Sequence, residues 1–291
     1  MRETDSTITG NDLRSASVGR TDELSAWLSS RRRLVALTGA GCSTESGIPD
    51  YRGPQGSWNR RKPMTIGEFL RSPENRQHYW ARSSRGWPRF AAAQPNSTHK
   101  ALAAMEHDHR LSFLITQNVD GLHQKAGSSE VLDLHGRNDR VICLECRQLS
   151  DRQALQNRLY ELNRNWFERS SEIPLTQLAD GDSELTRDDT LDFRCADCIA
   201  CGGLLKPDVV FFGESVPAPV VATAMNHVEN SDGLLVIGSS LTVWSGYRFA
   251  LAASKLAIPI AIINVGDSRA DDLAGIRVNR ECGAVLAELN L

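Results

Sequence analysis

Two pairs of cysteines are the clearest residues in this sequence with spacing suited to chemistry. Cys143 and Cys146 form one Cys-x-x-Cys pair, and Cys198 and Cys201 form a second. Each pair can place two thiolates on one side of a metal ion, and two pairs complete a tetrahedral Zn²⁺ site. Because four thiolates leave no open coordination position, we expect one structural zinc ion and not a catalytic one.

A third cysteine makes the second pair ambiguous. Cys195 and Cys198 also have the Cys-x-x-Cys spacing. The two glycines that follow Cys201 favour Cys198 and Cys201, since a zinc knuckle needs a tight turn. Cys195 is then a free thiol, and Cys282 is too isolated in the sequence to join the site. The alternative interpretation is that all of these cysteines are buried without a metal.

A glycine-containing turn follows the first apolar run of the chain. Leu34–Leu37 leads into Thr38-Gly39-Ala40-Gly41. Glycines at such a turn let the backbone approach a pyrophosphate closely. The third glycine of the usual dinucleotide fingerprint is replaced by Thr44, and no acidic residue clearly ends a second strand about twenty residues later. The sequence therefore argues against a hydride-transferring dehydrogenase.

One of the seven histidines has the position expected of a general base. His135 ends the apolar run Val131–Leu134 and precedes Gly136, which predicts a strand end facing a crevice. Its unperturbed pKa lies near neutrality, as proton transfer at physiological pH requires. The others are interpreted as surface, packing or structural residues, namely His78, His99, His107, His109, His123 and His227.

These candidates must be positioned by a repeated strand-and-helix pattern. Apolar runs that end in glycine, amide or hydroxyl residues occur at Leu34–Leu37, Leu111–Ile115, Gly233–Ile237 and Ile258–Ile263, with helical stretches such as His99–Glu106 and Tyr247–Lys255 between them. Such alternation predicts a parallel sheet covered on both faces. Ligands bind beyond the carboxyl ends of parallel strands, so we expect a nucleotide crevice there. Ordinary turns between strands and helices are the alternative.

The predicted fold class is α/β, a Rossmann-like parallel sheet domain with an inserted zinc-binding module and a small helical module. The sheet domain is expected over residues 19–53, 97–138 and 204–291. The helical module is expected over 54–96 and the zinc-binding module over 139–203. Residues 1–18 are expected to form a mobile tail.

Composition excludes several classes of protein. The 291 residues are 41% hydrophobic and 24% charged, which is ordinary for a soluble globular protein. A net charge of −3 argues against non-specific nucleic-acid binding. No apolar run approaches the roughly 18–20 residues that span a bilayer. The N-terminus has no apolar core segment and carries Glu3, Asp5 and Asp12, so it resembles neither a signal peptide nor a mitochondrial presequence. We expect a cytoplasmic protein with no membrane partner.

Six ordered blocks resemble the sirtuin family of NAD-dependent protein deacylases and extend over roughly residues 20–290. The blocks are Gly39–Arg52, Thr116–His123, Leu134–Gly136, Lys206–Glu214, Gly238–Ser240 and Asn264–Gly266. Cys42 departs from the small aliphatic residue that many members carry. The family pattern also places the second zinc pair just before a glycine-rich segment, which selects Cys198 and Cys201.

The resemblance implies an activity and its catalytic residues. NAD is the consumed co-substrate, and an acyl group passes from a protein lysine to ADP-ribose with release of nicotinamide. His135 is the implied general base on a ribose hydroxyl, with Asn118 and Asp120 as further catalytic residues. The nicotinamide pocket is expected near Ile48 and Asp50. The products are free lysine and O-acyl-ADP-ribose.

The resemblance also implies the binding residues. The cofactor-binding residues are Gly39, Ala40, Gly41, Ser43, Thr44, Ile48, Pro49, Asp50, Tyr51, Arg52, Gln117, Asn118, Val119, Asp120, Gly238, Ser239, Ser240, Asn264, Val265, Gly266 and Cys282, the last in a segment closing over the adenine end. An acylated-lysine protein substrate is expected to add as a strand. Its contacts are expected at Val209, Val210, Phe211, Gly213 and Glu214.

Further features resemble class II sirtuins, the branch that contains the mitochondrial lipoamidase and ADP-ribosyltransferase type. They include Arg76–Arg82, Gly86-Trp87-Pro88 and the long insert between the cysteine pairs. Tyr79 and Arg82 share one helical face, and Arg82 is a candidate for binding an acidic acyl group; the alternative is a packed surface arginine. The alternative functions are protein mono-ADP-ribosyl transfer, lipoamide removal and a non-catalytic NAD-sensing zinc scaffold.

Overall fold

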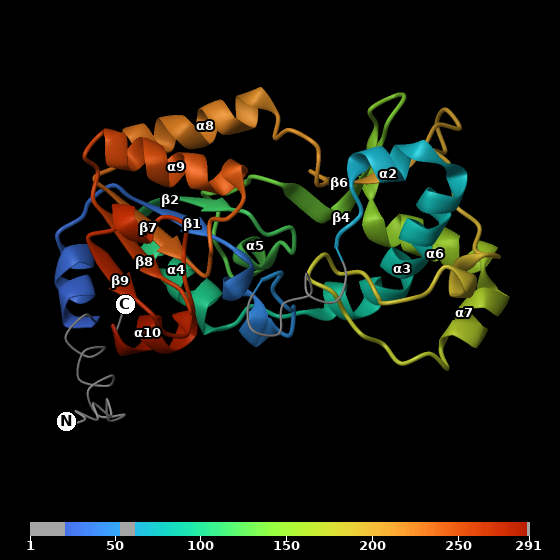
Figure 1. Ribbon diagram of the computed structural model, residues 1–291, viewed down its shortest axis with the longest axis horizontal. Helices are drawn as coiled ribbons and strands as arrows, with labels where there is room; N and C mark the ends of the chain where they lie inside the picture. The colour runs from blue at the N-terminus through green and yellow to red at the C-terminus, as the bar shows by residue number, and fades with distance from the viewer. Residues whose placement is uncertain (1–20, 53–61, 290–291) are drawn as a thin grey trace, which may run out of the picture.

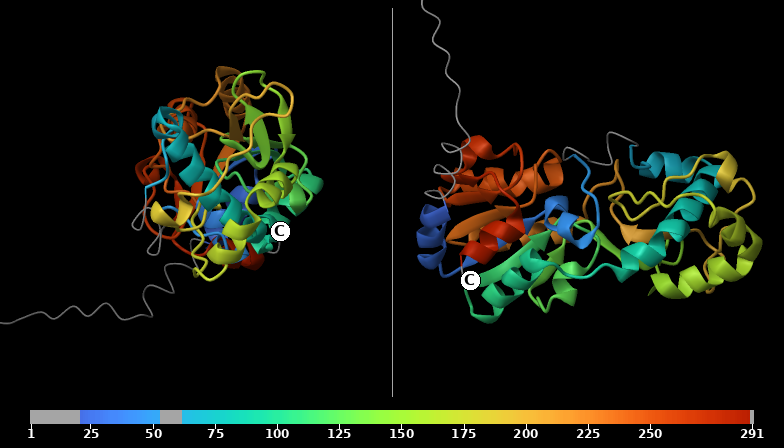
Figure 2. Two further views of the ribbon diagram at one scale, coloured as in Figure 1. Left: turned by 90° about the vertical axis from the view of Figure 1, so that its right-hand side faces the viewer. Right: turned by 90° about the horizontal axis from the view of Figure 1, so that it is seen from below.

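Two lobes make up the computed structural model, which describes residues 21–52 and 62–289. The larger lobe contains a six-stranded sheet and the smaller lobe a three-stranded sheet with helices packed around it, as Figure 1 and Figure 2 show. The predicted mobile tail, 1–18, lies outside the described residues, as do residues 54–61 of the predicted helical module.

The sheet of the larger lobe is parallel throughout and has the order β3-β2-β1-β7-β8-β9. Its strands are β1 (Leu34–Thr38), β2 (Leu111–Thr116), β3 (Val131–Asp133), β7 (Gly233–Ile237), β8 (Ile260–Ile263) and β9 (Ile276–Val278). The four predicted apolar runs form its centre, which confirms the predicted parallel sheet. Strand β9 has three residues and was not predicted, because so short a segment carries no readable period.

Helices cover both faces of this sheet (Figure 1). One face packs on a helix over 21–29, on α4 (Ser97–His107) and on α10 (Cys282–Glu288) through Leu24, Leu102 and Val285. The other packs on α8 (Ala218–Glu229) and α9 (Trp244–Lys255) through Val228 and Phe249. A sheet buried on both faces explains why its strands read as continuous apolar runs.

The strand order reverses beside β1. The chain continues from β1 to β2 and β3 on one side, and β7, β8 and β9 lie on the other. Loops that leave neighbouring strands in opposite directions open a crevice at their carboxyl ends, where ligands bind in open α/β sheets. The fold therefore places the turn after β1 and the turn after β7 at the same crevice.

The smaller lobe has an antiparallel sheet of order β5-β4-β6. Its elements are β4 (Gly136–Cys143), β5 (Leu149–Asp151), β6 (Leu205–Val209), α2 (Ile66–Arg71), α3 (Pro73–Ala92), α6 (Arg152–Leu162) and α7 (Arg164–Ser170). The zinc-binding module was predicted to end at residue 203. Strand β6 begins at Leu205 and pairs with β4, so the smaller lobe extends beyond that predicted boundary. Phe69 and Trp80 of α2 and α3 share a core with Val141 and Leu205, so the two predicted modules form one lobe.

No helix within 21–52 and 62–289 is both long and apolar enough to cross a lipid bilayer.

Candidate active site

A cavity of about 930 Å³ lies at the carboxyl ends of the sheet strands. Its wall combines the turn after β1, the loops after β2, β7 and β8, the start of α9 and, from the smaller lobe, Tyr79 and the segment after β6. This volume is within the range of sites that hold a cofactor-sized ligand. The cavity is therefore the candidate active site.

Two glycine turns meet at the base of the cavity with their backbones in contact. A Cβ atom at Gly39 would lie 2.7 Å from Cβ of Ser239, and one at Gly41 would lie 2.9 Å from Cα of Gly238. Gly238 itself has φ of +60°, a conformation that favours glycine. Gly41 also donates its N–H to the carbonyl of Gly238 over 2.9 Å. The predicted glycine turn thus forms a narrow backbone cradle, which suits close approach of phosphates.

A serine hydroxyl links the two polar side chains predicted after β2. Ser43 Oγ donates to Asp120 Oδ2 over 2.7 Å and accepts from Asn118 Nδ2 over 3.0 Å. Asn118 Nδ2 also donates to the carbonyl of Gly39 over 3.0 Å. Asp120 Oδ1 accepts the backbone N–H of Leu122. The network holds the carboxylate and the amide at the cavity wall beside the glycine turn.

The hydrogen bonds of His135 fix its tautomer. Nδ1 lies 2.8 Å from the carbonyl oxygen of Gln117, and Nε2 lies 2.8 Å from Ser245 Oγ. Because a carbonyl oxygen only accepts, Nδ1 carries the proton and Nε2 has the free lone pair in the neutral ring. Burial lowers the pKa of His135, and the bond to Gln117 opposes that shift. A neutral imidazole with its Nε2 lone pair at the cavity wall has the form that a general base needs.

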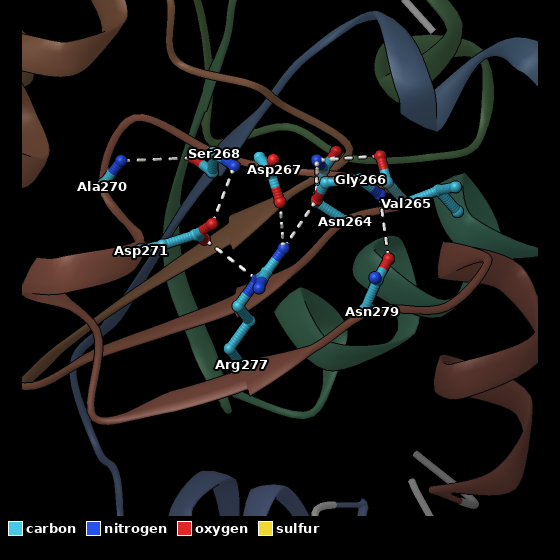
Figure 3. Close-up of polar contacts among 9 residues, drawn as sticks. All are labelled: Asn264, Val265, Gly266, Asp267, Ser268, Ala270, Asp271, Arg277 and Asn279. Atoms are coloured by element: carbon cyan, nitrogen blue, oxygen red, sulfur yellow. Dashed lines mark hydrogen bonds and ion pairs between the residues drawn. The ribbon is translucent and has the colours of Figure 1, made fainter. Parts of the chain in front are cut away.

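Hydrogen bonds from β9 and from the residue that follows it hold the loop after β8 in place. Arg277 donates to the carbonyl of Gly266 over 3.1 Å and to Asp267 Oδ1 over 3.0 Å, as Figure 3 shows. Asn279 Oδ1 accepts the N–H of Gly266 over 2.8 Å. Asn264 donates from Nδ2 to the same carbonyl of Gly266. These bonds fix the predicted Asn264–Gly266 block against the cavity.

A buried lysine organises the smaller lobe's side of the cavity. Lys206 Nζ contacts the carbonyl of Val209 at 2.5 Å and Glu214 Oε2 at 2.9 Å. Glu214 Oε2 also accepts the N–H of Phe211 over 2.7 Å. The N–H of Val210 donates to the carbonyl of His135 over 2.8 Å, which ties this segment to the candidate base. The predicted substrate-binding residues therefore form one braced turn along the cavity.

The structure separates Tyr79 from Arg82. Tyr79 lines the cavity and its ring centroid lies 5.2 Å from that of Phe211. Arg82 is not among the lining residues: its Nη2 lies 3.3 Å from Asp182 Oδ2, and its Nε donates to the carbonyl of Ser183. The prediction that Arg82 binds an acyl carboxylate is corrected here, because its charge already has a buried partner. Spacing on a helix showed a shared face but not what that face packs against.

Three predicted cofactor residues do not line the cavity. Thr44 is exposed, and its Oγ1 donates to the carbonyl of Gly41. Pro49 lies between two lining residues. Cys282 is buried at the start of α10, where its thiol faces the carbonyl of Ile263 at 3.7 Å. The remaining predicted cofactor residues line the cavity.

Sequence reasoning missed the residues at the start of α9. Trp244, Ser245 and Arg248 line the cavity. The predicted helix began at Tyr247, whereas α9 begins at Trp244, three residues earlier. The sequence did contain a signal for these residues, because no glycine or proline separates the Gly238–Ser240 block from the start of the helix.

The structure brings together the four cysteines of the predicted zinc site. The Sγ atoms of Cys143, Cys146, Cys198 and Cys201 all lie within 4.8 Å of one another. The Cys143–Cys201 and Cys146–Cys198 separations are 3.5 Å and 3.8 Å. A tetrahedral ion with Zn–S bonds of about 2.3 Å places its sulfurs about 3.8 Å apart, so the cluster fits zinc. None of the four lines the cavity, and Cys195 lies outside the cluster.

Fold and site together define an α/β protein with a cofactor-sized cavity, a partly buried histidine on its wall and four cysteines spaced for one metal ion. The family model described as the Sir2 family matches residues 39–245. The chain therefore belongs to the Sir2 family, whose members are the sirtuins. The resemblance seen in the sequence is confirmed at the level of the family.

Curated relatives extend this similarity over almost the whole chain. The NAD-dependent protein deacetylase 2 of Bradyrhizobium diazoefficiens is 48% identical over 266 residues, covering 91% of this chain and 96% of the relative. The NAD-dependent protein deacetylase 1 of Mycobacterium avium is 50% identical over 274 residues, covering 94% and 96%.

Solved Sir2 structures superpose on most of this chain. A Sir2 protein in complex with a p53 peptide and NAD⁺ superposes with a TM-score of 0.71 at 28% identity, covering 92% of this chain and 96% of that one. A complex with deacetylated peptide and 3′-O-acetyl ADP-ribose gives a TM-score of 0.72 at 26% identity, covering 92% and 96%.

Proposed function

We propose that this protein is an NAD-dependent protein-lysine deacetylase that transfers the acyl group of an acylated lysine to ADP-ribose. The observation that carries the proposal is the neutral His135, whose Nε2 lone pair lies at the wall of a cofactor-sized cavity. The names of the curated relatives and the ligands of the solved Sir2 structures support it.

NAD supplies a ribose whose bond to nicotinamide can be replaced by a bond to the acyl oxygen. The cradle formed by Gly39, Gly41 and Gly238 would hold the phosphates close to backbone N–H groups. Asn118 and Asp120, fixed by Ser43, would orient the ribose and the nicotinamide amide. We assign these roles from the position of each side chain on the cavity wall.

His135 would accept the proton of a ribose hydroxyl at Nε2. Its Nδ1–H bond to the Gln117 carbonyl holds the ring and stabilises the positive charge that follows proton transfer. Burial keeps the pKa of the imidazole below its usual value, so the base is unprotonated at neutral pH. A general base of this kind contributes typically 10²–10⁴-fold to the rate.

The acylated-lysine substrate would bind along the braced turn of the smaller lobe. Val209, Val210 and Phe211 line the cavity, and the contacts of Lys206 with Val209 and Glu214 hold their backbone in one conformation. A pre-organised backbone lowers the entropy cost of adding a peptide strand and gives little sequence preference.

Zinc bound by the four cysteines would stabilise the smaller lobe and take no part in the reaction. Cys143 ends β4, and Cys198 and Cys201 precede β6, so the ion would join the two strands that carry the substrate turn. With four thiolate ligands it has no position for water or substrate.

For the acyl group, we propose that the cavity accepts chains longer than acetyl. Tyr79 and Phe211 pack against each other at the wall and offer an aromatic surface to an aliphatic chain. Arg82 is withdrawn as the basis for an acidic preference, because Asp182 is its partner. The class II resemblance agrees with this broader acyl range.

The test incubates one lysine peptide carrying acetyl, longer aliphatic, lipoyl or glutaryl groups with labelled NAD, and identifies products by mass spectrometry. We expect deacylated peptide together with O-acyl-ADP-ribose in solution. Label attached to protein without O-acyl-ADP-ribose would instead identify a mono-ADP-ribosyltransferase. Binding of NAD with no product from any peptide would identify a non-catalytic sensor.

A further inference from the structure

We propose that Ser245 is a positioning residue that holds the imidazole of His135 in its working tautomer. Its hydroxyl oxygen lies 2.8 Å from Nε2, the nitrogen that must accept the ribose proton. The role rests on the proposed function, in which His135 is the general base.

The direction of this hydrogen bond follows from the other side of the ring. Nδ1 donates to the Gln117 carbonyl at 2.8 Å, and burial lowers the pKa of His135, so the ring is neutral. A neutral ring has one N–H only, and therefore Nε2 accepts and the Ser245 hydroxyl donates. The imidazole is thus held at both nitrogens, by groups 128 residues apart in the chain, Gln117 and Ser245.

The two groups that hold His135 belong to segments packed tightly against each other. Gly246 follows Ser245 on α9, and a Cβ atom there would lie 2.4 Å from Oε1 of Gln117. Gln117 in turn donates from Nε2 to Ser239 Oγ at 2.8 Å. The start of α9 and the loop after β2 therefore form one unit, in which the Gly246 backbone packs against the Gln117 side chain.

A hydroxyl donating to Nε2 has a defined effect on the base. It holds the neutral ring in the Nδ1–H tautomer, because only that tautomer has its lone pair on Nε2. When a ribose hydroxyl binds, the serine O–H rotates away, and the Nε2 lone pair of His135 becomes free to accept the ribose proton. After proton transfer the new Nε2–H can donate to Ser245 Oγ. The proton leaves the ribose oxygen and stays on the ring, so no other co-reactant is needed.

Charged groups also face this part of the cavity and have to be considered in any pH profile. The charged residues that line the cavity are Asp50, Arg52, Asp120, Asp180, Glu214, Arg248 and Asp267. Each remains unchanged when Ser245 is replaced, so a shift in the profile reports the loss of the serine hydroxyl.

The kinetic test compares Ser245→Ala, Ser245→Thr and the control Ser254→Ala near the end of the same helix. A neutral hydrogen bond is typically worth about threefold to tenfold in rate, so Ser245→Ala should lower kcat by that factor. The KM for NAD and peptide should stay within about twofold. The acid limb of kcat/KM should move to lower pH, because the protonated ring loses a charge-assisted hydrogen bond. Ser245→Thr should restore both. A kcat and pH profile like wild type in Ser245→Ala would overturn the assignment.

The structural test needs no activity. Long-range ¹H–¹⁵N spectra, with His135 assigned by its absence in His135→Gln, report the imidazole tautomer directly. We expect the Nδ1–H form in the wild type and a mixture of tautomers in Ser245→Ala. An Nε2–H form in the wild type would overturn the inference, even in a protein that deacylates normally. An inactive wild type with the Nδ1–H form would overturn only the proposed function.

Discussion

Replacing Arg82 by methionine should destabilise the protein and leave acyl choice unchanged. The guanidinium of Arg82 lies 3.3 Å from Asp182, and the two side chains are 2% and 1% exposed. Removing one partner of a buried ion pair leaves the other charge uncompensated, which typically costs about 3–5 kcal/mol. The sequence suggested instead that Arg82 binds an acyl carboxylate, so this variant separates the two roles.

The neighbouring Arg152 decides how much stability is lost when either partner of the ion pair, Arg82 or Asp182, is replaced. It is fully buried, and burial lowers its pKa to about 10 while Asp182 and Tyr79 favour its charged form. Arg82→Met leaves Asp182 with Arg152, which favours the lower end, about 3 kcal/mol. Asp182→Asn leaves two buried cations, which favours the upper end, about 5 kcal/mol. At about 2 °C per kcal/mol for a chain of this length, Tm should fall by about 6 °C and 10 °C.

The assay is thermal unfolding together with kcat/KM on acetyl and glutaryl peptides. Arg89→Met, an exposed position on the same helix, is the matched control and should leave Tm within about 1 °C. A Tm for Arg82→Met equal to that of Arg89→Met, together with selective loss of glutaryl activity, would refute the buried-pair account.

Three further predictions concern the metal, the substrate turn and pH. Cys201→Ser should lose zinc and unfold at lower temperature, whereas Cys195→Ser should retain one zinc per chain; metal analysis that shows the reverse would mean a different ligand set. Lys206→Met should raise the KM for peptide several-fold while the KM for NAD stays unchanged, measured by initial rates, since its contacts brace only the peptide side. Burial lowers the pKa of His123 far below its ordinary value, so the unfolded chain binds more protons. The free energy of unfolding should therefore fall as pH drops below about 6.5, and denaturant titrations should show a smaller fall in His123→Asn.

The central sheet was predictable because its strands are buried on both faces. Leu34–Leu37 and Gly233–Ile237 are unbroken apolar runs, and a glycine of the following turn lies within two residues of the end of each. The zinc ligands were predictable for a similar reason, since two knuckles must each supply two closely spaced thiolates. In both cases a local pattern specified the structure.

Features that depend on distant contacts were not predictable. Arg82 and Asp182 are a hundred residues apart, and neither sequence context indicates an ion pair. Strand β6 belongs to the smaller sheet because it pairs with β4, a strand more than sixty residues earlier in the chain. Ser245 was missed because its contact with His135 depends on where α9 starts relative to the loop after β2.

The central claim is tested most directly by single-turnover product analysis of wild type and His135→Ala with an acetyl-lysine peptide and NAD. We predict equal amounts of nicotinamide, deacetylated peptide and O-acetyl-ADP-ribose from the wild type. His135→Ala should bind NAD with unchanged affinity and form the acetylated product at least about a hundredfold more slowly. A variant that keeps more than roughly a tenth of the wild-type rate, or a wild type that releases nicotinamide without O-acetyl-ADP-ribose, would contradict the account.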